Sequence, residues 1–169
     1  MRTTTRAAAL AAGVTLVGVL ALAGCAQTVT LQPADDAANP LCAKVSVELT
    51  FLDTVAGLEP RETNAQATAA WGEPATVLLR CGVASPPPTA EFPCFTIEGV
   101  DWLRDDTGDP NFVFTTYGRT PAVEVIIDSD GDPDIPDDGV SGLEALTDVA
   151  RAVAAIPADR ECVAIGEAG

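Results

Sequence analysis

An apolar stretch near the N-terminus constrains the fold of this chain more than any other feature. Residues 7–22 contain only apolar residues, glycine and one threonine, and they follow a start made basic by Arg2 and Arg6. This stretch is shorter than the roughly 20 apolar residues that a membrane-spanning helix needs. A basic start, an apolar core and small residues behind it are typical of a secretory signal peptide. We therefore expect residues 1–24 to be removed, so that only the remaining chain folds.

The end of this segment, Leu22–Cys25 with the sequence LAGC, resembles the lipobox of bacterial prolipoproteins. The resemblance implies a diacylglyceryl group, with fatty acyl chains such as palmitate, on the thiol of Cys25 and cleavage before that residue. Stable anchoring needs two acyl chains, or one chain and a basic cluster, and no basic cluster lies near Cys25. Two or more acyl chains would therefore have to provide the anchoring. We expect a protein that these chains hold on the extracytoplasmic face of the cell membrane. The alternative is an ordinary signal peptide in which a cysteine happens to occupy this position.

Four further cysteines remain once Cys25 is assigned to lipid. They are Cys42, Cys81, Cys94 and Cys162. An even number of cysteines in an exported protein predicts disulfides, and four cysteines allow three pairings. We favour Cys42–Cys81 and Cys94–Cys162, each of which would stabilise the fold by about 4 kcal/mol on the chain-entropy model. A metal site is the weaker alternative, because the chain has no histidine and no C-x-x-C pair.

Residues 25–40 are expected to form the lipidated cysteine and a tether, because the segment after Cys25 is small, polar and contains two prolines. A single folded domain is expected over residues 41–169. Its first helix is predicted to begin at Asn39, which can cap a helix, and Pro40, which suits the first helical position. Apolar residues follow at helical spacing: Leu41, Val45, Leu49 and Leu52. A strand over residues 45–51 is the alternative, because apolar residues also alternate there.

Four strands are predicted after this helix. They are residues 75–81, 95–103, 111–117 and 123–127. Residues 57–70 show no periodicity and are expected to form a loop, whereas the prolines within residues 82–93 predict an extended, exposed segment. The apolar residues of segment 95–103 change parity around Gly99, which predicts a β-bulge there. The last three strands are expected to form an antiparallel meander.

A second helix is predicted after residue 141. Ser141 and Glu144 fit a capping box, apolar residues follow at helical spacing, and Pro157 ends the pattern. The sequence therefore predicts one α+β domain, in which two helices pack on an antiparallel sheet of about four strands.

The net charge of the chain limits the classes of molecule that it can bind. Nine basic and 25 acidic residues give a net charge of −16, and removal of residues 1–24 takes two of the basic residues away. A surface of this charge is repelled by nucleic acid and by anionic lipid head groups. We therefore expect no nucleic-acid partner, whereas cationic partners and divalent metal ions are compatible with this acidic surface.

Several catalytic motifs are missing from the sequence. The absence of histidine excludes Ser-His-Asp and Cys-His catalysis. The single lysine, Lys44, lies outside any phosphate-binding loop, and no serine occupies a G-x-S-x-G elbow. Catalysis by a pair of carboxylates, as in glycosidases, is not excluded, because the chain has 25 acidic residues.

One acidic segment resembles the oxygen-rich loops that bind calcium. Its alternate aspartates are Asp128, Asp130, Asp132 and Asp134. The match to an EF-hand loop is partial, because Pro133 replaces the glycine of position six and Gly139 replaces the glutamate of position twelve. The simpler interpretation is a solvated turn, since Asp, Gly and Pro also favour turns. Calcium is therefore a possible ligand, and no other cofactor is expected.

Five segments together resemble a family of actinobacterial lipoproteins whose domain has no known function. They are Trp71–Pro74 (WGEP), Val77–Gly82 (VLLRCG), Gly99–Trp102 (GVDW), Phe114–Arg119 (FTTYGR) and Val123–Val125 (VEV). The similarity spans about residues 40–157. It implies a single domain and agrees with a lipoprotein, but it supplies no activity, substrate or catalytic residue.

Four residues within these motifs have both a functional and a structural interpretation. We interpret Trp71 and Trp102 as packing residues rather than as a platform for a ligand. We interpret Arg80 and Arg119 as partners of nearby carboxylates rather than as contacts for an anion or a partner protein.

These observations favour a non-enzymatic lipoprotein that binds an envelope protein or a wall component. The tethered domain, the acidic surface and the missing catalytic motifs motivate this hypothesis. A calcium-stabilised structural module is the second hypothesis, and a carboxylate-dependent hydrolase of the cell wall is the third.

Overall fold

The computed structural model describes residues 27–130 and 139–163. The predicted signal peptide, Cys25, Asp132 and Asp134 lie outside these residues. Among the described residues, no helix has both the length and the apolar character that crossing a membrane requires.

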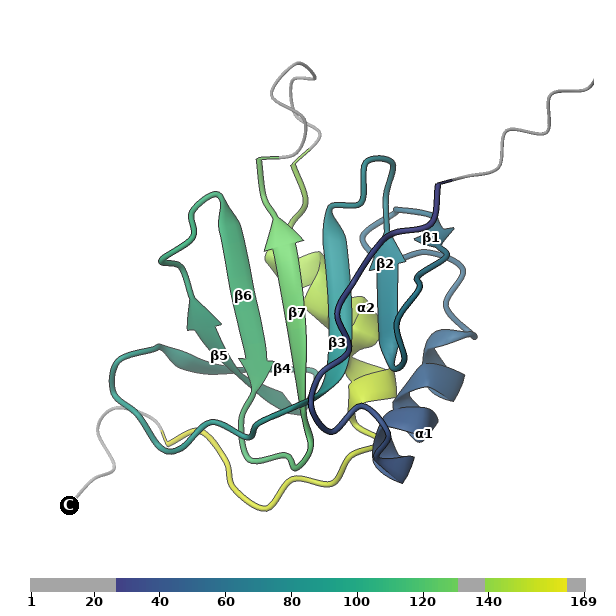
Figure 1. The fold of residues 1–169 in the computed structure, drawn as a ribbon. Helices are drawn as coiled ribbons and strands as arrows, with labels where there is room; N and C mark the ends of the chain where they lie inside the picture. The colour runs from purple at the N-terminus through teal and green to yellow at the C-terminus, as the bar shows by residue number, and fades with distance from the viewer. Residues whose placement is uncertain (1–26, 131–138, 164–169) are drawn as a thin grey trace, which may run out of the picture.

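A seven-stranded antiparallel sheet forms the centre of the fold, and two helices cover one of its faces (Figure 1). The strands are β1 (Pro60–Arg61), β2 (Thr68–Trp71), β3 (Val77–Val83), β4 (Cys94–Ile97), β5 (Val100–Asp105), β6 (Asn111–Thr116) and β7 (Ala122–Asp128). Their spatial order is β1-β2-β3-β7-β6-β5-β4. The helices are α1 (Pro40–Leu49) and α2 (Gly142–Val153). The predicted α+β class is confirmed, but the prediction of about four strands is wrong.

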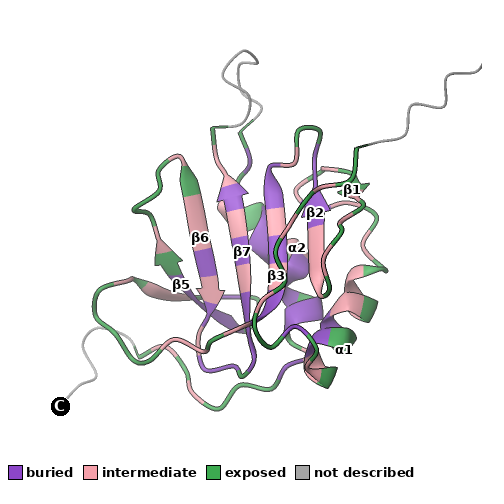
Figure 2. Cartoon of the chain, viewed as in Figure 1, coloured by how far each residue is buried: buried purple, intermediate pink, exposed green. Residues whose placement is uncertain are grey.

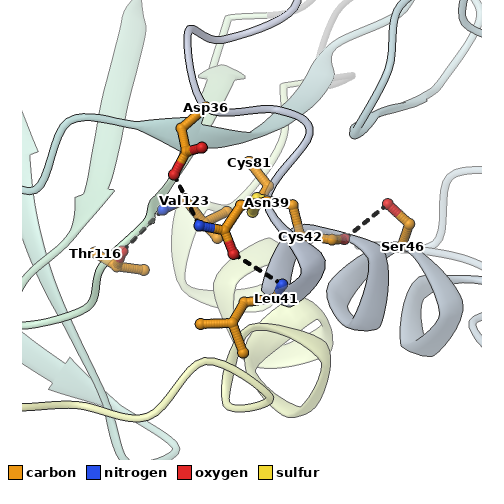
Figure 3. Close-up of a disulfide and its surroundings, with 8 residues drawn as sticks. All are labelled: Asp36, Asn39, Leu41, Cys42, Ser46, Cys81, Thr116 and Val123. Carbon is orange, nitrogen blue, oxygen red and sulfur yellow. Dashed lines mark hydrogen bonds between the residues drawn. A yellow bond between two sulfur atoms is a disulfide. The ribbon is translucent and has the colours of Figure 1, made fainter.

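Both predicted helices are present and begin at the predicted caps. The side chain of Asn39 accepts a hydrogen bond of 2.9 Å from the backbone N–H of Leu41, with Pro40 as the first helical residue (Figure 3). The side chain of Ser141 accepts one of 3.4 Å from the N–H of Glu144. These bonds satisfy N–H groups that have no partner within the helix, so the local sequence is enough to place both starts.

The core lies between the sheet and the helices. Along β3 and β7, buried residues alternate with intermediate ones, which Figure 2 shows as bands on the two strands. The buried residues of these strands face α1 and α2, which contribute Val45, Leu146 and Val149 among others. Trp71 and Trp102 are 2% and 0% exposed, so the prediction that both are packing residues is confirmed.

The predicted strand over residues 95–103 is instead a hairpin. Strands β4 and β5 pair through Ile97↔Val100, and only Glu98 and Gly99 connect them. Both connecting residues have positive φ, 47° and 75°, as a type I′ turn requires. The change of parity at Gly99 therefore marks a reversal of the chain and not the expected bulge. The strands that follow, β5, β6 and β7, form the predicted antiparallel meander.

Residues 57–70 also differ from the prediction, because they contain β1 and β2 rather than a loop. Strand β1 has only two residues, and β2 is rich in threonine and alanine, which give no apolar alternation. The two strands form because β2 pairs along its length with β3 from Thr68↔Arg80 to Trp71↔Val77. Pairing with a neighbour, rather than local sequence, decides their structure.

The described part of the predicted tether, residues 27–39, lies against the domain (Figure 1). The N–H of Val29 donates to the carbonyl of Glu62 at 2.8 Å, and Leu31 lines a small hollow on the outer face of β3 and β7. Further on, the N–H of Asp36 donates to the carbonyl of Gly82 at 3.0 Å. This segment therefore packs on the face of the sheet that the helices leave open.

The two disulfides have the pairing that the sequence analysis favoured. Cys42 of α1 is bonded to Cys81 of β3, and Cys94 of β4 is bonded to Cys162 in the C-terminal segment. The first is inside the core, with Cys42 and Cys81 0% and 1% exposed (Figure 3). The second joins two partly exposed residues at the edge of the sheet.

We predict that Gly82→Ala destabilises the protein because it displaces the docked N-terminal segment. A Cβ atom at position 82 would lie 2.5 Å from the backbone nitrogen of Ala37, and the φ angle of Gly82 is +105°. We expect the free energy of unfolding to fall by about 3 kcal/mol in denaturant titrations. Gly57→Ala is the control, because its φ is +75° but nothing lies within 4 Å of the added Cβ. The control should cost about 1 kcal/mol, and equal losses in the two variants would contradict the predicted clash.

Candidate functional site

An apolar hollow of about 450 Å³ opens where strands β4 to β6 meet the first turn of α2. Its apolar lining consists of Phe95, Ile97, Phe112, Phe114, Leu143 and Leu146. Thr96, Arg104 and Ser129 supply its polar groups. Cavities of 300–1,000 Å³ with a mostly apolar lining and a few polar groups are typical of ligand sites, so this hollow is the candidate functional site.

Three phenylalanines form the aromatic wall of the hollow. Phe112 and Phe114 are two residues apart on β6, so their side chains point to the same face of the sheet. Phe95 comes from β4, and its ring meets that of Phe114 edge to face, with centroids 6.1 Å apart. Phe114 is buried, whereas Phe95 and Phe112 are half-buried and offer ring surface to a ligand.

Helix α2 forms the opposite wall. Its first residue, Gly142, lies close to Phe114, since a Cβ atom there would be 3.1 Å from the tip of the phenylalanine ring. Leu146 is fully buried at the base, whereas Leu143 is 65% exposed at the mouth. An apolar side chain with this exposure next to an apolar hollow extends the surface that a ligand would cover.

The rim of the hollow carries one positive charge, that of Arg104. Its guanidinium lies 6.0 Å from the centroid of the Phe112 ring and is 3.1 Å from the carboxylate of Asp106. Beside it, hydrogen bonds from the backbone and side chain of Thr107 lower the pKa of Asp105, so this carboxylate stays ionised. The hollow is therefore suited to hold an apolar group, with the charged groups of Arg104 and Asp106 at its rim. Its lining residues include no pair of groups arranged for acid–base catalysis.

A smaller hollow of about 230 Å³ is polar and lies beside the Cys94–Cys162 disulfide. It is lined by Asp101, Arg119 and Glu161 among others. Both oxygens of Asp101 accept hydrogen bonds, one from the Thr96 hydroxyl at 2.5 Å and one from the N–H of Cys162 at 2.7 Å. Asp101 therefore holds the C-terminal segment in place, and this role disfavours its use as the acid or base of the hydrolase hypothesis.

The two arginines singled out by the sequence have different partners. Arg80 forms an ion pair with Glu124 at 2.5 Å, as predicted. Arg119 forms no ion pair with a carboxylate among the described residues; its guanidinium donates to the backbone carbonyls of Ile156 and Gly99, and the carboxylate of Asp101 acts on it only through its charge. Burial lowers the pKa of Arg119, and the negative charge of Asp101 opposes this shift. Arg119 therefore fixes the segment that follows α2.

Only two of the four aspartates in the predicted calcium loop are described. The Asp128 carboxylate accepts a hydrogen bond of 3.1 Å from the N–H of Asp130, which is the contact of an Asx turn. Within the described ranges, no three His, Cys, Asp or Glu residues lie close enough to hold a metal ion. Calcium binding by this segment stays a prediction.

Sequence reasoning did not predict the apolar hollow. It predicted the strand over residues 111–117, which carries Phe112 and Phe114, but the hairpin that brings Phe95 beside them was missed. A signal was present, because three of the five phenylalanines in the chain line this hollow.

The chain belongs to the DUF3515 family, described as proteins of unknown function, whose family model matches residues 7–161. The predicted membership in a family of unknown function is thereby confirmed. No curated protein and no solved structure matches the chain.

If the acidic segment binds calcium, we predict that millimolar calcium raises the melting temperature of the protein, because a ligand that binds only the folded state stabilises it. Differential scanning fluorimetry after chelator treatment measures this shift. Magnesium is the control, since it prefers six ligands in a stricter geometry than calcium. An unchanged melting temperature in calcium would remove the calcium hypothesis.

Proposed function

We propose that this DUF3515 protein is a lipid-anchored lipoprotein on the extracytoplasmic face of the cell membrane, where its domain binds an envelope protein or a wall component. The binding role rests on one observation, the apolar hollow between β4–β6 and α2 with exposed Leu143 at its mouth. In this proposal the protein is an accessory or binding module and not an enzyme.

Export is supported by the two disulfides. Such bonds persist in oxidising compartments and are rare in the cytosol. The Cys42–Cys81 bond is inside the core and joins α1 to β3, so oxidation of this pair is part of the folded state. This agrees with a signal peptide that ends at the LAGC sequence.

The docked N-terminal segment supports a short connection between anchor and domain. The carbonyl of Gln27 accepts a hydrogen bond of 2.8 Å from Arg61, so the domain begins two residues after Cys25. At about 3.5 Å per extended residue, the domain would lie within about 7 Å of the lipidated residue. A module held this close to the membrane would bind partners that are themselves at the membrane surface.

We predict that Cys25→Ser abolishes anchoring, because serine cannot form the thioether to the lipid. The unchanged protein should incorporate labelled palmitate in native cells and sediment with membranes, whereas the variant should do neither. Ala26→Ser is the control and should keep both properties. Palmitate labelling of the Cys25→Ser protein would show that the lipid is attached elsewhere.

The binding role has its own test, which uses a photo-crosslinking residue in intact native cells. We predict that p-benzoyl-phenylalanine in place of Leu143 gives one reproducible crosslinked species on irradiation, because a ligand in the hollow would contact this position. The same replacement of Phe51 is the matched control, since Phe51 is also exposed, at 68%, but follows α1 and lies away from the hollow. Equal patterns from the two positions, or no product at 143, would argue against the hollow as the binding site.

A further inference from the structure

Strand β4 is the last strand on its side of the sheet. It pairs with β5 from Cys94↔Leu103 to Ile97↔Val100, and the spatial order places no strand beyond it. In the described part of the chain, no backbone hydrogen bond joins Cys94–Ile97 to any segment other than β5. The outer edge of β4 therefore offers unpaired backbone groups.

The hairpin geometry identifies which groups these are. In a two-residue hairpin the pair next to the turn, here Ile97 and Val100, exchanges both hydrogen bonds, and the pattern then alternates. Phe95 and Trp102 are thus a hydrogen-bonded pair. The bond of 3.1 Å from the Arg104 N–H to the Pro93 carbonyl agrees with this alternation, because it falls two residues further along both strands. Thr96 lies between these pairs, so its N–H and C=O point away from β5.

The apolar hollow borders this free edge. Three consecutive residues of β4, Phe95, Thr96 and Ile97, line it. Since alternate side chains of a strand point to opposite faces, three consecutive residues can line one hollow only where it reaches the strand's edge. Leu143 and Leu146 of α2 form the other wall. The result is a groove between an edge strand and a helix.

We propose that this groove binds an extended peptide segment of a partner protein by strand addition to β4. The peptide exchanges hydrogen bonds with the N–H and C=O of Thr96, and an apolar side chain enters the hollow beside Phe95 and Phe114. Strand addition commonly combines backbone pairing with pockets for alternate side chains. This inference rests on the proposed binding role and names its ligand class and mode.

Two other occupants fit less well. An acyl chain would fill the hollow, but it has no donor or acceptor that could pair with the Thr96 N–H and C=O. A second copy would bring two strongly acidic chains together edge to edge, and their repulsion opposes such pairing. The peptide is therefore neutral or basic overall, with alternating apolar residues.

The test uses the protein as its native cells process it, with any membrane-bound form placed in phospholipid nanodiscs so that no detergent competes for the hollow. The probe is a synthetic library of eight-residue peptides with alternating apolar and polar residues and no net negative charge. Binding is measured for the unchanged protein and for Thr96→Pro, which removes the edge N–H from a position outside the β4–β5 ladder. Thr96→Ala is the matched control, because both variants lose the hydroxyl bond to Asp101 but only proline removes the N–H.

We expect selected peptides to bind the unchanged protein and the Thr96→Ala variant. They should bind Thr96→Pro about tenfold more weakly, since the proline lacks the N–H that would donate to the peptide and its ring obstructs the pairing strand. Leu143→Glu should abolish binding, whereas Phe51→Glu, at an exposed position away from the groove, should not. Independently of any variant, hydrogen exchange at the Thr96 amide should slow when peptide is added.

Three results would overturn the proposal. They are the absence of any bound peptide, equal binding by the proline and alanine variants with unchanged exchange at Thr96, and dimerisation of the protein through β4 in sedimentation experiments. Each of these leaves the crosslinking result at Leu143 standing, so a partner that binds the hollow in another way remains distinguishable.

Discussion

The buried disulfide between Cys42 and Cys81 is the point on which the rest of the domain depends. It joins the first helix to the central strand β3, and neither sulfur-bearing residue is more than 1% exposed. The carbonyl of the next residue, Gly82, accepts a hydrogen bond from the N–H of Asp36, and the missing side chain of Gly82 leaves room for the backbone of Ala37. A larger residue at this place would separate the N-terminal segment from the sheet. Helix, sheet and docked segment therefore meet at two consecutive residues.

The two helices cover only part of one face of the sheet, and this explains why a hollow exists. Seven strands at about 4.8 Å spacing span about 29 Å, whereas two packed helices cover only about 20 Å. Helix α1 lies against β3, and α2 lies against β7 and β4. The aromatic inner surface of β6 is only partly covered: α2 approaches Phe114 closely at Gly142, whereas Phe112 stays half-buried. The hollow follows from the number of elements as much as from any single residue.

Local signals predicted the parts of this fold that depend on local chemistry. Asn39 and Ser141 place the helix starts because a cap needs only its own side chain and the next turn. Strands β1 and β2 could not be predicted this way, since β2 is held by pairing with β3, and β1 by pairing with β2. The β4–β5 hairpin was missed because Glu98, a residue that rarely adopts positive φ, occupies the first turn position. That single error hid the edge of β4 and, with it, the candidate site.

The two edges of the sheet differ in whether the chain supplies a further backbone partner, and this difference bears on function. Directly after β1, the chain supplies its own partner: Val29 pairs in parallel with Thr63, and its N–H and C=O are bonded to Glu62 and Asn64. Proteins commonly protect edge strands because unpaired backbone invites another chain. At β4 the described chain adds the disulfide to Cys162 but no backbone partner at Thr96. An edge left open beside an apolar hollow, in a chain that covers its other edge, is where we expect a partner to pair.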